Sequence, residues 1–406
     1  MARLISGFRQ LFFLTVLLTS LVSRASDAVE RFINHRAIDP ASVAVMMINL
    51  SDGSVMESYN ADMPLIPASV MKSVTIATLI EKTGIDYRYH TRLYAAGNIH
   101  KGVLDGNLII DGGGDPSLNS SVEPITEDFV AECLGAIKNA GIKRITGRII
   151  ADEDIFPGPA VPPSWMKADL AHAYGTGCHG LNFENNSSGS RSVANPAAVL
   201  QTRLKNELRR VGVEVEGVPI HKGEEQLLLD HQSAPIDEIM RSCMMRSDNL
   251  FAEALLRTYG LEHADNGSTS ASAKMEKEFW ARKKLSLGGV NIVDGSGLSR
   301  ENRLTATFLA EVLRSMSPNV DYVSFFPLAG QEGTLKNFLI DTPLDGYIAM
   351  KTGSMNGIQC YAGYKLDEEY APTHVVVIMM NNIRTRSGVK EAASRLLLDV
   401  FASNET

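Results

Sequence analysis

The sequence has few cysteines, no excess of basic residues and no long apolar run beyond its first 25 positions. Four cysteines in 406 residues, with no C-x-x-C pair, exclude a disulfide framework and the spacing of a zinc knuckle or thioredoxin motif. The nine histidines form no H-E-x-x-H pattern, so no metal or other cofactor is expected. A net charge of −8 leaves no basic excess for a phosphate backbone, which excludes nucleic acid as a partner. Without an internal stretch of ~18 apolar residues, a multi-span membrane protein is also excluded.

The N-terminus has the features of a secretory signal in the usual order. Arg3 and Arg9 form a positive region, residues 11–22 form an apolar stretch, and small residues follow up to Ala25. This stretch is short for a spanning helix, which needs about 20 residues. We therefore predict a cleaved signal peptide over residues 1–25, cut after Ala25, and a periplasmic location. A membrane anchor is the alternative.

Two segments near the start of the remaining chain have clear periodicity. Residues 42–60 alternate between apolar and polar side chains around Ser51–Gly53, and the Asp-Gly pair predicts a hairpin turn. Residues 68–82 carry apolar side chains at helical spacing without a breaker, and Gly84 follows. This pattern predicts a mostly buried helix that ends at the glycine.

The sequence pattern changes near residue 91 and again near residue 235. Between these positions we expect strands over 92–96, 107–111 and 144–151, and helices over 127–140 and 196–210. After them we expect helices over 236–246 and 250–259, strands over 347–352, 359–365 and 374–380, and a last helix over 388–402. Helices followed by a β-meander indicate an antiparallel sheet flanked by helices. We predict a discontinuous α+β domain, residues 26–90 and 235–406, interrupted by a smaller inserted α/β domain over 91–234.

The helix predicted at 68–82 begins with a serine and a lysine three residues apart. A helix places residues i and i+3 on one face, so Lys72 can reach the hydroxyl of Ser69. An amine in an apolar setting loses its proton more easily. Lys72 could then be the base that makes Ser69 nucleophilic. Alone, the S-x-x-K pattern more often marks an N-cap serine with a surface lysine.

Two further short motifs could carry chemistry. Ser247–Asn249 (S-D-N) lies between two predicted helices, where Asp and Asn are also common as caps. Lys351–Gly353 (K-T-G) lies on a predicted strand that ends in a turn. A lysine among apolar strand neighbours is unusual, and Gly353 would let a substrate backbone approach closely.

In the order S-x-x-K, S-D-N and K-T-G, the three motifs match the set found in penicillin-binding proteins and class A β-lactamases. Ser69 and Ser247 are 178 positions apart, a far longer gap than in β-lactamases. The chain therefore resembles the class C low-molecular-mass penicillin-binding proteins, the D-Ala-D-Ala carboxypeptidase/endopeptidase family with an inserted domain. Residues 111–118, 294–300 and 333–335 look like that family as well. The inserted region is shorter than in the larger members.

The resemblance implies a penicillin-recognising (β-lactamase/transpeptidase-like) fold and an exported serine peptidase. Ser69 would attack the carbonyl between two D-alanines of a peptidoglycan stem peptide and form an acyl-enzyme, which β-lactam inhibitors would also form. Lys72 would take the Ser69 proton, and Ser247 would pass a proton to the leaving D-Ala. Asn249 would hold Lys72 and the substrate amide. Lys351 would steady the Ser247 hydroxyl and the terminal carboxylate.

The same resemblance implies residues for substrate binding. Thr352 and Ser354, on either side of Gly353, would hydrogen-bond the substrate carboxylate or backbone, and the N–H groups of Ser69 and Ser354 would form an oxyanion hole. Asp152 is similar to a family acid that can meet the free amine of a stem peptide, with a solvated turn carboxylate as the alternative.

Two other functions stay open at this stage. A β-lactamase-like hydrolase would deacylate fast, but no glutamate stands in the E-x-x-L-N context. A non-catalytic penicillin-binding sensor would bind without turnover, although all motif residues are present. Residues 175–180 fit G-x-G-x-x-G, yet they follow no clear strand and open no helix, so nucleotide binding is not expected.

Overall fold

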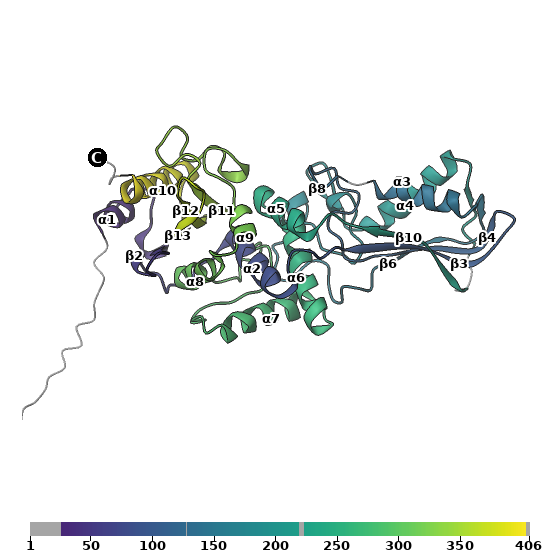
Figure 1. Ribbon diagram of the computed structural model, residues 1–406, viewed down its shortest axis with the longest axis horizontal. Helices are drawn as coiled ribbons and strands as arrows, with labels where there is room; N and C mark the ends of the chain where they lie inside the picture. The colour runs from purple at the N-terminus through teal and green to yellow at the C-terminus, as the bar shows by residue number, and fades with distance from the viewer. Residues whose placement is uncertain (1–25, 127, 219–222, 403–406) are drawn as a thin grey trace, which may run out of the picture.

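The computed structural model describes residues 26–126, 128–218 and 223–402. The predicted signal peptide, residues 1–25, falls outside the described residues. The molecule is elongated, with two lobes along its long axis (Figure 1). One lobe contains the strands from the two ends of the chain, and the other contains the strands from its middle.

The first lobe is built on a five-stranded antiparallel sheet in the order β11-β12-β13-β1-β2. Its strands are β1 (Val43–Asn49), β2 (Val55–Tyr59), β11 (Ile348–Met355), β12 (Ile358–Leu366) and β13 (Pro372–Asn381). β1 and β2 form the hairpin that the Asp-Gly turn predicts. β1 also pairs with β13, so the two ends of the chain close one sheet.

Both faces of this sheet are buried. In β1, Ala44, Met46 and Ile48 pack into one core, and Val43 and Val45 pack into the other. The helices over the two faces are α2 (Met71–Thr83) and α8 (Ala306–Met316) on the first, and α1 (Asp27–Ile33) and α10 (Arg386–Phe401) on the second. Because water reaches neither face of the two central strands, β1 and most of β13 are apolar. The predicted antiparallel sheet flanked by helices is confirmed.

The helical layer around α2 extends toward the second lobe. It contains α5 (Ile236–Arg246), α6 (Asn249–Ala264), α7 (Thr269–Arg282) and α9 (Val320–Ser324). The sequence predicted α5 and α6, with α6 beginning one residue earlier and ending five residues later than expected. It did not identify α7 or α8.

The second lobe contains a mixed sheet in the order β10-β3-β4-β5-β9, with β6 also paired to β4. Its elements are β3 (His90–His100), β4 (Val103–Asp111), β5 (Arg144–Ile145), β6 (Ile149–Asp152), β9 (Glu214–Val215), β10 (Glu225–Gln232), α3 (Phe129–Asn139) and α4 (Pro196–Arg210), with a small hairpin of β7 (Ser187–Ser188) and β8 (Arg191–Ser192).

The single strand predicted over 144–151 is in fact two short strands, β5 and β6. Between them Gly147 lies so close to the Gly106 carbonyl that an added Cβ would be 2.3 Å from its oxygen. The domain boundaries at 91 and 234 stay a prediction.

The described residues offer neither a membrane span nor a metal site. The four cysteines are buried free thiols. Within these residues no helix is both long and apolar enough to cross a bilayer. No group of three or more His, Cys, Asp or Glu in the described ranges could hold a metal ion.

A fully buried acid lies between α2 and α7. Glu276 Oε1 accepts a hydrogen bond of 3.1 Å from the Thr78 hydroxyl, which in turn accepts one of 2.9 Å from the Trp280 indole. Burial raises the pKa of Glu276 to about 8 from 4.5. The folded protein therefore keeps this carboxyl protonated under conditions in which the unfolded chain ionises it.

Replacing Glu276 by glutamine should flatten the pH dependence of stability. The raised pKa stabilises the folded state below pH 4.5, and this contribution is lost as the pH rises to about 8. Glutamine keeps the shape and the acceptor oxygen but cannot ionise. Urea denaturation at about pH 5 and about pH 9 measures how far the free energy of unfolding falls between these two pH values. The fall should be larger in the wild type than in Glu276→Gln by a few kcal/mol, since one pKa unit corresponds to about 1.4 kcal/mol. Equal losses in both proteins would contradict this.

Candidate active site

The candidate nucleophile lies on a strained turn that leads into α2. Ser69 is the middle residue of the 3₁₀ turn η2 (Ala68–Val70), and Ala68 has a φ of 48°, a left-handed value that costs energy for a residue with a Cβ. β11 packs directly behind the turn. A Cβ on Gly353 would lie 2.5 Å from the Pro67 carbonyl oxygen and 3.1 Å from the Ser69 nitrogen. The absence of a side chain at 353 therefore lets the strand support the turn.

Lys72 lies one helical turn after Ser69 and is fully buried. Its Nζ is 3.0 Å from Ser69 Oγ, 2.6 Å from Asn249 Oδ1 and 2.7 Å from the Ser296 carbonyl oxygen. Two of these partners can only accept a hydrogen bond. A neutral amine has two N–H groups for them and one lone pair, which then faces the Ser69 hydroxyl. The geometry therefore suits Lys72 as a base toward Ser69.

The electrostatics of the site shift Lys72 toward its neutral form. Burial lowers the pKa of Lys72, and neighbouring groups, among them Asp294 and Asp248, oppose this shift. Burial also holds the pKa of Lys351 well below its ordinary value, and the charge of Lys72 lowers it further. Two buried ammonium groups in one site each disfavour the charge on the other.

The second motif lies at the junction of α5 and α6. Ser247 ends α5 with a left-handed φ of 59°, and the Asp248 carboxylate caps α6 by accepting a hydrogen bond from the Phe251 N–H. This reversal brings Ser247 Oγ to 2.9 Å from Lys351 Nζ. It also directs Asn249 to Lys72. The cap function that the sequence left open for this motif is thus performed by Asp248, while Ser247 and Asn249 are available to the site.

Two cavities open at Ser69. The smaller, of about 400 Å³, contains the hydroxyls of Thr334, Thr352 and Ser354. The larger, of about 890 Å³, is lined by Asp169. Arg386, the first residue of α10, lines both cavities. The smaller cavity thus offers hydroxyl groups and a guanidinium beside Ser69, and the larger cavity contains one acid, Asp169, together with Arg300 and Arg386.

The structure brings five of the predicted site residues together in one place. These are Ser69, Lys72, Ser247, Asn249 and Lys351. Thr352 and Ser354 line the smaller cavity beside them. Gly353 is approached by the backbone of the nucleophile turn, rather than by open space for a substrate.

Asp152 is placed elsewhere. It lies at the end of β6, where its Oδ1 accepts a hydrogen bond of 3.1 Å from the Asp154 N–H, and it lines neither cavity. The acid in the larger cavity is Asp169, which accepts a hydrogen bond of 3.0 Å from the Tyr174 hydroxyl. Sequence reasoning missed Asp169, because nothing in a loop without periodicity distinguishes one carboxylate from the next.

The family comparison agrees with this site. The model of the D-Ala-D-Ala carboxypeptidase 3 (S13) family matches residues 25–189 and 184–404. The chain belongs to this family. It is therefore a hydrolase of the serine peptidase type, and its resemblance to the class C low-molecular-mass penicillin-binding proteins is confirmed.

Individual relatives are similar over most of their length. The D-alanyl-D-alanine carboxypeptidase DacB of Haemophilus influenzae is 24% identical over 80% of this chain and 82% of its own. Carboxypeptidase DacB of Mycolicibacterium smegmatis is 28% identical over 78% and 71%. The crystal structure of penicillin binding protein 4 from Haemophilus influenzae has a TM-score of 0.80 at 22% identity, covering 92% of this chain and 99% of that one. The last match confirms the predicted fold class.

Proposed function

We propose that this S13 peptidase hydrolyses D-Ala-D-Ala peptides of peptidoglycan through an acyl-enzyme on Ser69. The observation that supports this most is the contact of 3.0 Å between Ser69 Oγ and Lys72 Nζ. The two other partners of the amine, Asn249 Oδ1 and the Ser296 carbonyl oxygen, accept hydrogen bonds, so the lone pair of the neutral amine is left for Ser69. The name of the Haemophilus influenzae relative supports the substrate, since that protein is a D-alanyl-D-alanine carboxypeptidase.

In the proposed acylation step, the lone pair of Lys72 takes the proton of the Ser69 hydroxyl as its oxygen bonds to the carbonyl carbon. The N–H groups of Ser69 and Ser354 stabilise the oxyanion, a contribution of about 3 kcal/mol per donor in serine hydrolases. The C–N bond then breaks, and the Ser247 hydroxyl gives a proton to the leaving amine. Lys72 replaces that proton with the one it took from Ser69, while Lys351 donates a hydrogen bond of 2.9 Å to the Ser247 oxygen. Water afterwards hydrolyses the ester and frees Ser69.

Substrate binding follows from the charges around Ser69. The carboxylate of the leaving D-Ala fits the smaller cavity, where Thr352 and Ser354 offer hydroxyls and Arg386 offers a guanidinium. An amine of the stem peptide fits the larger cavity, where Asp169 supplies the carboxylate. A stem peptide with this amine acetylated should therefore have a higher KM. An unchanged KM would rule out the role of Asp169.

A fluorescent penicillin separates this function from its alternatives. We expect a stable label on the wild type, no label on Ser69→Ala, and release of D-Ala from a pentapeptide. Rapid loss of label would indicate a β-lactamase-like hydrolase, and a stable label without D-Ala release would indicate a sensor. The structure of the Haemophilus influenzae protein with a β-lactam supports penicillin as a suitable probe.

We also propose that the protein is exported to the periplasm, with residues 1–25 as a cleaved signal peptide. The support is the N-terminal sequence pattern and the substrate, which lies outside the cytoplasmic membrane. The mass of the protein recovered from the periplasm of a bacterial host should correspond to a chain that begins at Ser26. A mass that includes residues 1–25 would exclude cleavage.

A further inference from the structure

The two acceptors that hold the Lys72 amine come from different parts of the chain. One is Asn249 Oδ1, at the first residue of α6, and the other is the Ser296 carbonyl oxygen, in a buried loop over residues 294–299. The lone pair of the amine faces Ser69 only while both acceptors keep their places. The groups that orient these two acceptors therefore bear on the reaction.

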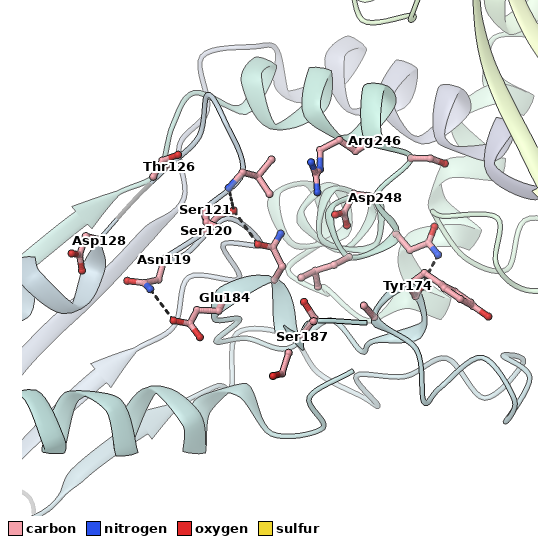
Figure 2. A pocket seen from close by; sticks show the side chains of 18 of the residues that line it. Asn119, Ser120, Ser121, Thr126, Asp128, Tyr174, Glu184, Ser187, Arg246 and Asp248 are labelled. Atoms are coloured by element: carbon pink, nitrogen blue, oxygen red, sulfur yellow. Dashed lines mark hydrogen bonds between the residues drawn. The ribbon is translucent and has the colours of Figure 1, made fainter. Parts of the chain in front are cut away.

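Asn249 is oriented by a backbone carbonyl. Its Nδ2 donates a hydrogen bond of 2.7 Å to the Tyr174 oxygen, which is the dashed line beside Tyr174 in Figure 2. The amide nitrogen can only donate, and the amide oxygen can only accept. With an acceptor on one side and the Lys72 amine on the other, the amide has one favourable orientation, in which its oxygen faces Lys72.

The Ser296 carbonyl is oriented through the peptide unit that precedes it. The Gly295 oxygen of this unit accepts a hydrogen bond of 3.1 Å from the Thr75 hydroxyl on α2. The Ser296 N–H of the same unit donates one of 2.8 Å to Glu253 Oε1 on α6. The two helices thus hold opposite ends of one peptide unit, and this fixes the direction in which the next carbonyl, that of Ser296, points.

A second buried acid, Asp294, has a different role in the loop. It accepts four hydrogen bonds of 2.6 to 2.8 Å, from the N–H groups of Gly297 and Ser299, the Asn302 amide and the Trp165 indole. These bonds give the loop its own shape. Glu253 instead lies one helical turn after Asn249, so it ties the loop to the helix that carries the other acceptor of Lys72.

Glu253 is costly for the stability of the fold. Its side chain is fully buried, and within the described residues its Oε2 has no hydrogen-bond partner. A buried polar atom without a partner destabilises the folded state, and an apolar side chain of the same volume avoids that cost. The bond to the Ser296 N–H, rather than stability, therefore accounts for an acid at this position.

We propose that Glu253 is a positioning residue for Lys72. By accepting a hydrogen bond from the Ser296 N–H, it orients the Ser296 carbonyl toward the amine, whose lone pair then stays directed at Ser69. This inference rests on the proposed acyl-enzyme and adds a residue that does not touch the substrate.

The effect of Glu253 comes from its reach and not from its charge. Burial and the charge of Asp294 raise the pKa of Glu253 above its ordinary 4.5, which favours the neutral carboxyl. The carbonyl oxygen of a neutral carboxyl still accepts a hydrogen bond from the Ser296 N–H. A glutamine has the same length and the same acceptor, so it should replace the acid.

Three substitutions at position 253 separate reach, charge and volume. Glu253→Gln keeps the length and the acceptor oxygen, Glu253→Asp keeps the carboxyl but is shorter, and Glu253→Met keeps only the volume. Stopped-flow labelling at increasing concentrations of a fluorescent penicillin gives both the acylation rate constant and the noncovalent dissociation constant. Thermal denaturation shows whether each variant is folded.

Glu253→Met and Glu253→Asp should lower the acylation rate constant by roughly 10- to 100-fold, because a misplacement of ~1 Å can cost about 100-fold. Glu253→Gln should stay within about threefold of the wild type, since the acceptor for the Ser296 N–H is kept. The dissociation constant should change by less than about threefold in all three variants, because Glu253 lines neither cavity at Ser69.

Leu255→Ala is the matched control for a loss of packing in α6. Leu255 is fully buried on the same helix, but it lies roughly 200° around the helix axis from Glu253. Its truncation should lower the melting temperature, because it leaves a cavity in the core. The acylation rate constant should stay within about threefold of the wild-type value.

Several results would overturn the proposal. They are wild-type acylation by Glu253→Met, equal losses in Glu253→Gln and Glu253→Met, and a loss in Glu253→Gln with none in Glu253→Asp, which would indicate a role of charge. An equal loss in Leu255→Ala would reduce the effect to general destabilisation. Failure of the wild type to form a stable label would refute the proposed function instead, so the two failures are distinguishable.

Discussion

Lys72→Ala should lower the rate constant for acylation of Ser69 by about 1,000-fold or more. The variant removes the only lone pair that faces the hydroxyl in the described site, and general-base catalysis contributes about 10²- to 10⁴-fold. It also leaves Asn249 Oδ1 without its partner at 2.6 Å. Stopped-flow labelling with a fluorescent penicillin measures the rate constant.

Two comparisons make this result specific. Lys72→Arg should lose as much as Lys72→Ala, since a guanidinium stays protonated and cannot act as the base. Lys82→Ala, on an exposed position of the same helix, should acylate at the wild-type rate. Acylation of Lys72→Ala at the wild-type rate would refute the proposed base.

The wild-type acylation rate should also rise with pH. Because burial lowers the pKa of Lys72 below its ordinary 10.5, the reactive neutral amine forms at lower pH than on an exposed lysine. The rate should therefore increase through an apparent pKa below 10.5 and then level off. This limb should be absent from the residual activity of Lys72→Ala.

Gly353→Ala should lower the acylation rate constant by about 100-fold or more while the protein still folds. The new Cβ would lie 2.5 Å from the Pro67 carbonyl oxygen and 3.1 Å from the Ser69 nitrogen, so either the strand or the nucleophile turn must move. A displacement of this kind moves both proposed oxyanion donors, each of which contributes about 3 kcal/mol in serine hydrolases. The same labelling experiment measures the effect.

Gly357→Ala is the matched control, in the turn between β11 and β12. An added Cβ there meets nothing within 4 Å, although its φ of 78° is costly for alanine. We expect a modest loss of thermal stability and wild-type acylation. If Gly353→Ala acylated as fast as Gly357→Ala, the turn would not depend on the close approach of β11.

Elements with strong local periodicity could be predicted from the sequence. The hairpin at 42–60, the helix after Ser69 and the helix starting at Pro196 formed as their patterns indicate. The strand over 144–151 could not be predicted correctly, because the interruption at Gly147 comes from contact with Gly106, 41 positions earlier. α7 was missed because its sequence mixes charged and small residues with few apolar ones.

The chemistry of the family could be predicted from local sequence: a serine and a lysine one helical turn apart, followed by two short motifs in a diagnostic order. The surroundings of these residues depend on how the chain folds. It placed Asp169 rather than Asp152 in the cavity, and it brought Ser247 to Lys351. Local geometry fixes which residues along a helix can hydrogen-bond to one another, whereas burial, pKa shifts and cavities depend on segments that meet only when the chain has folded.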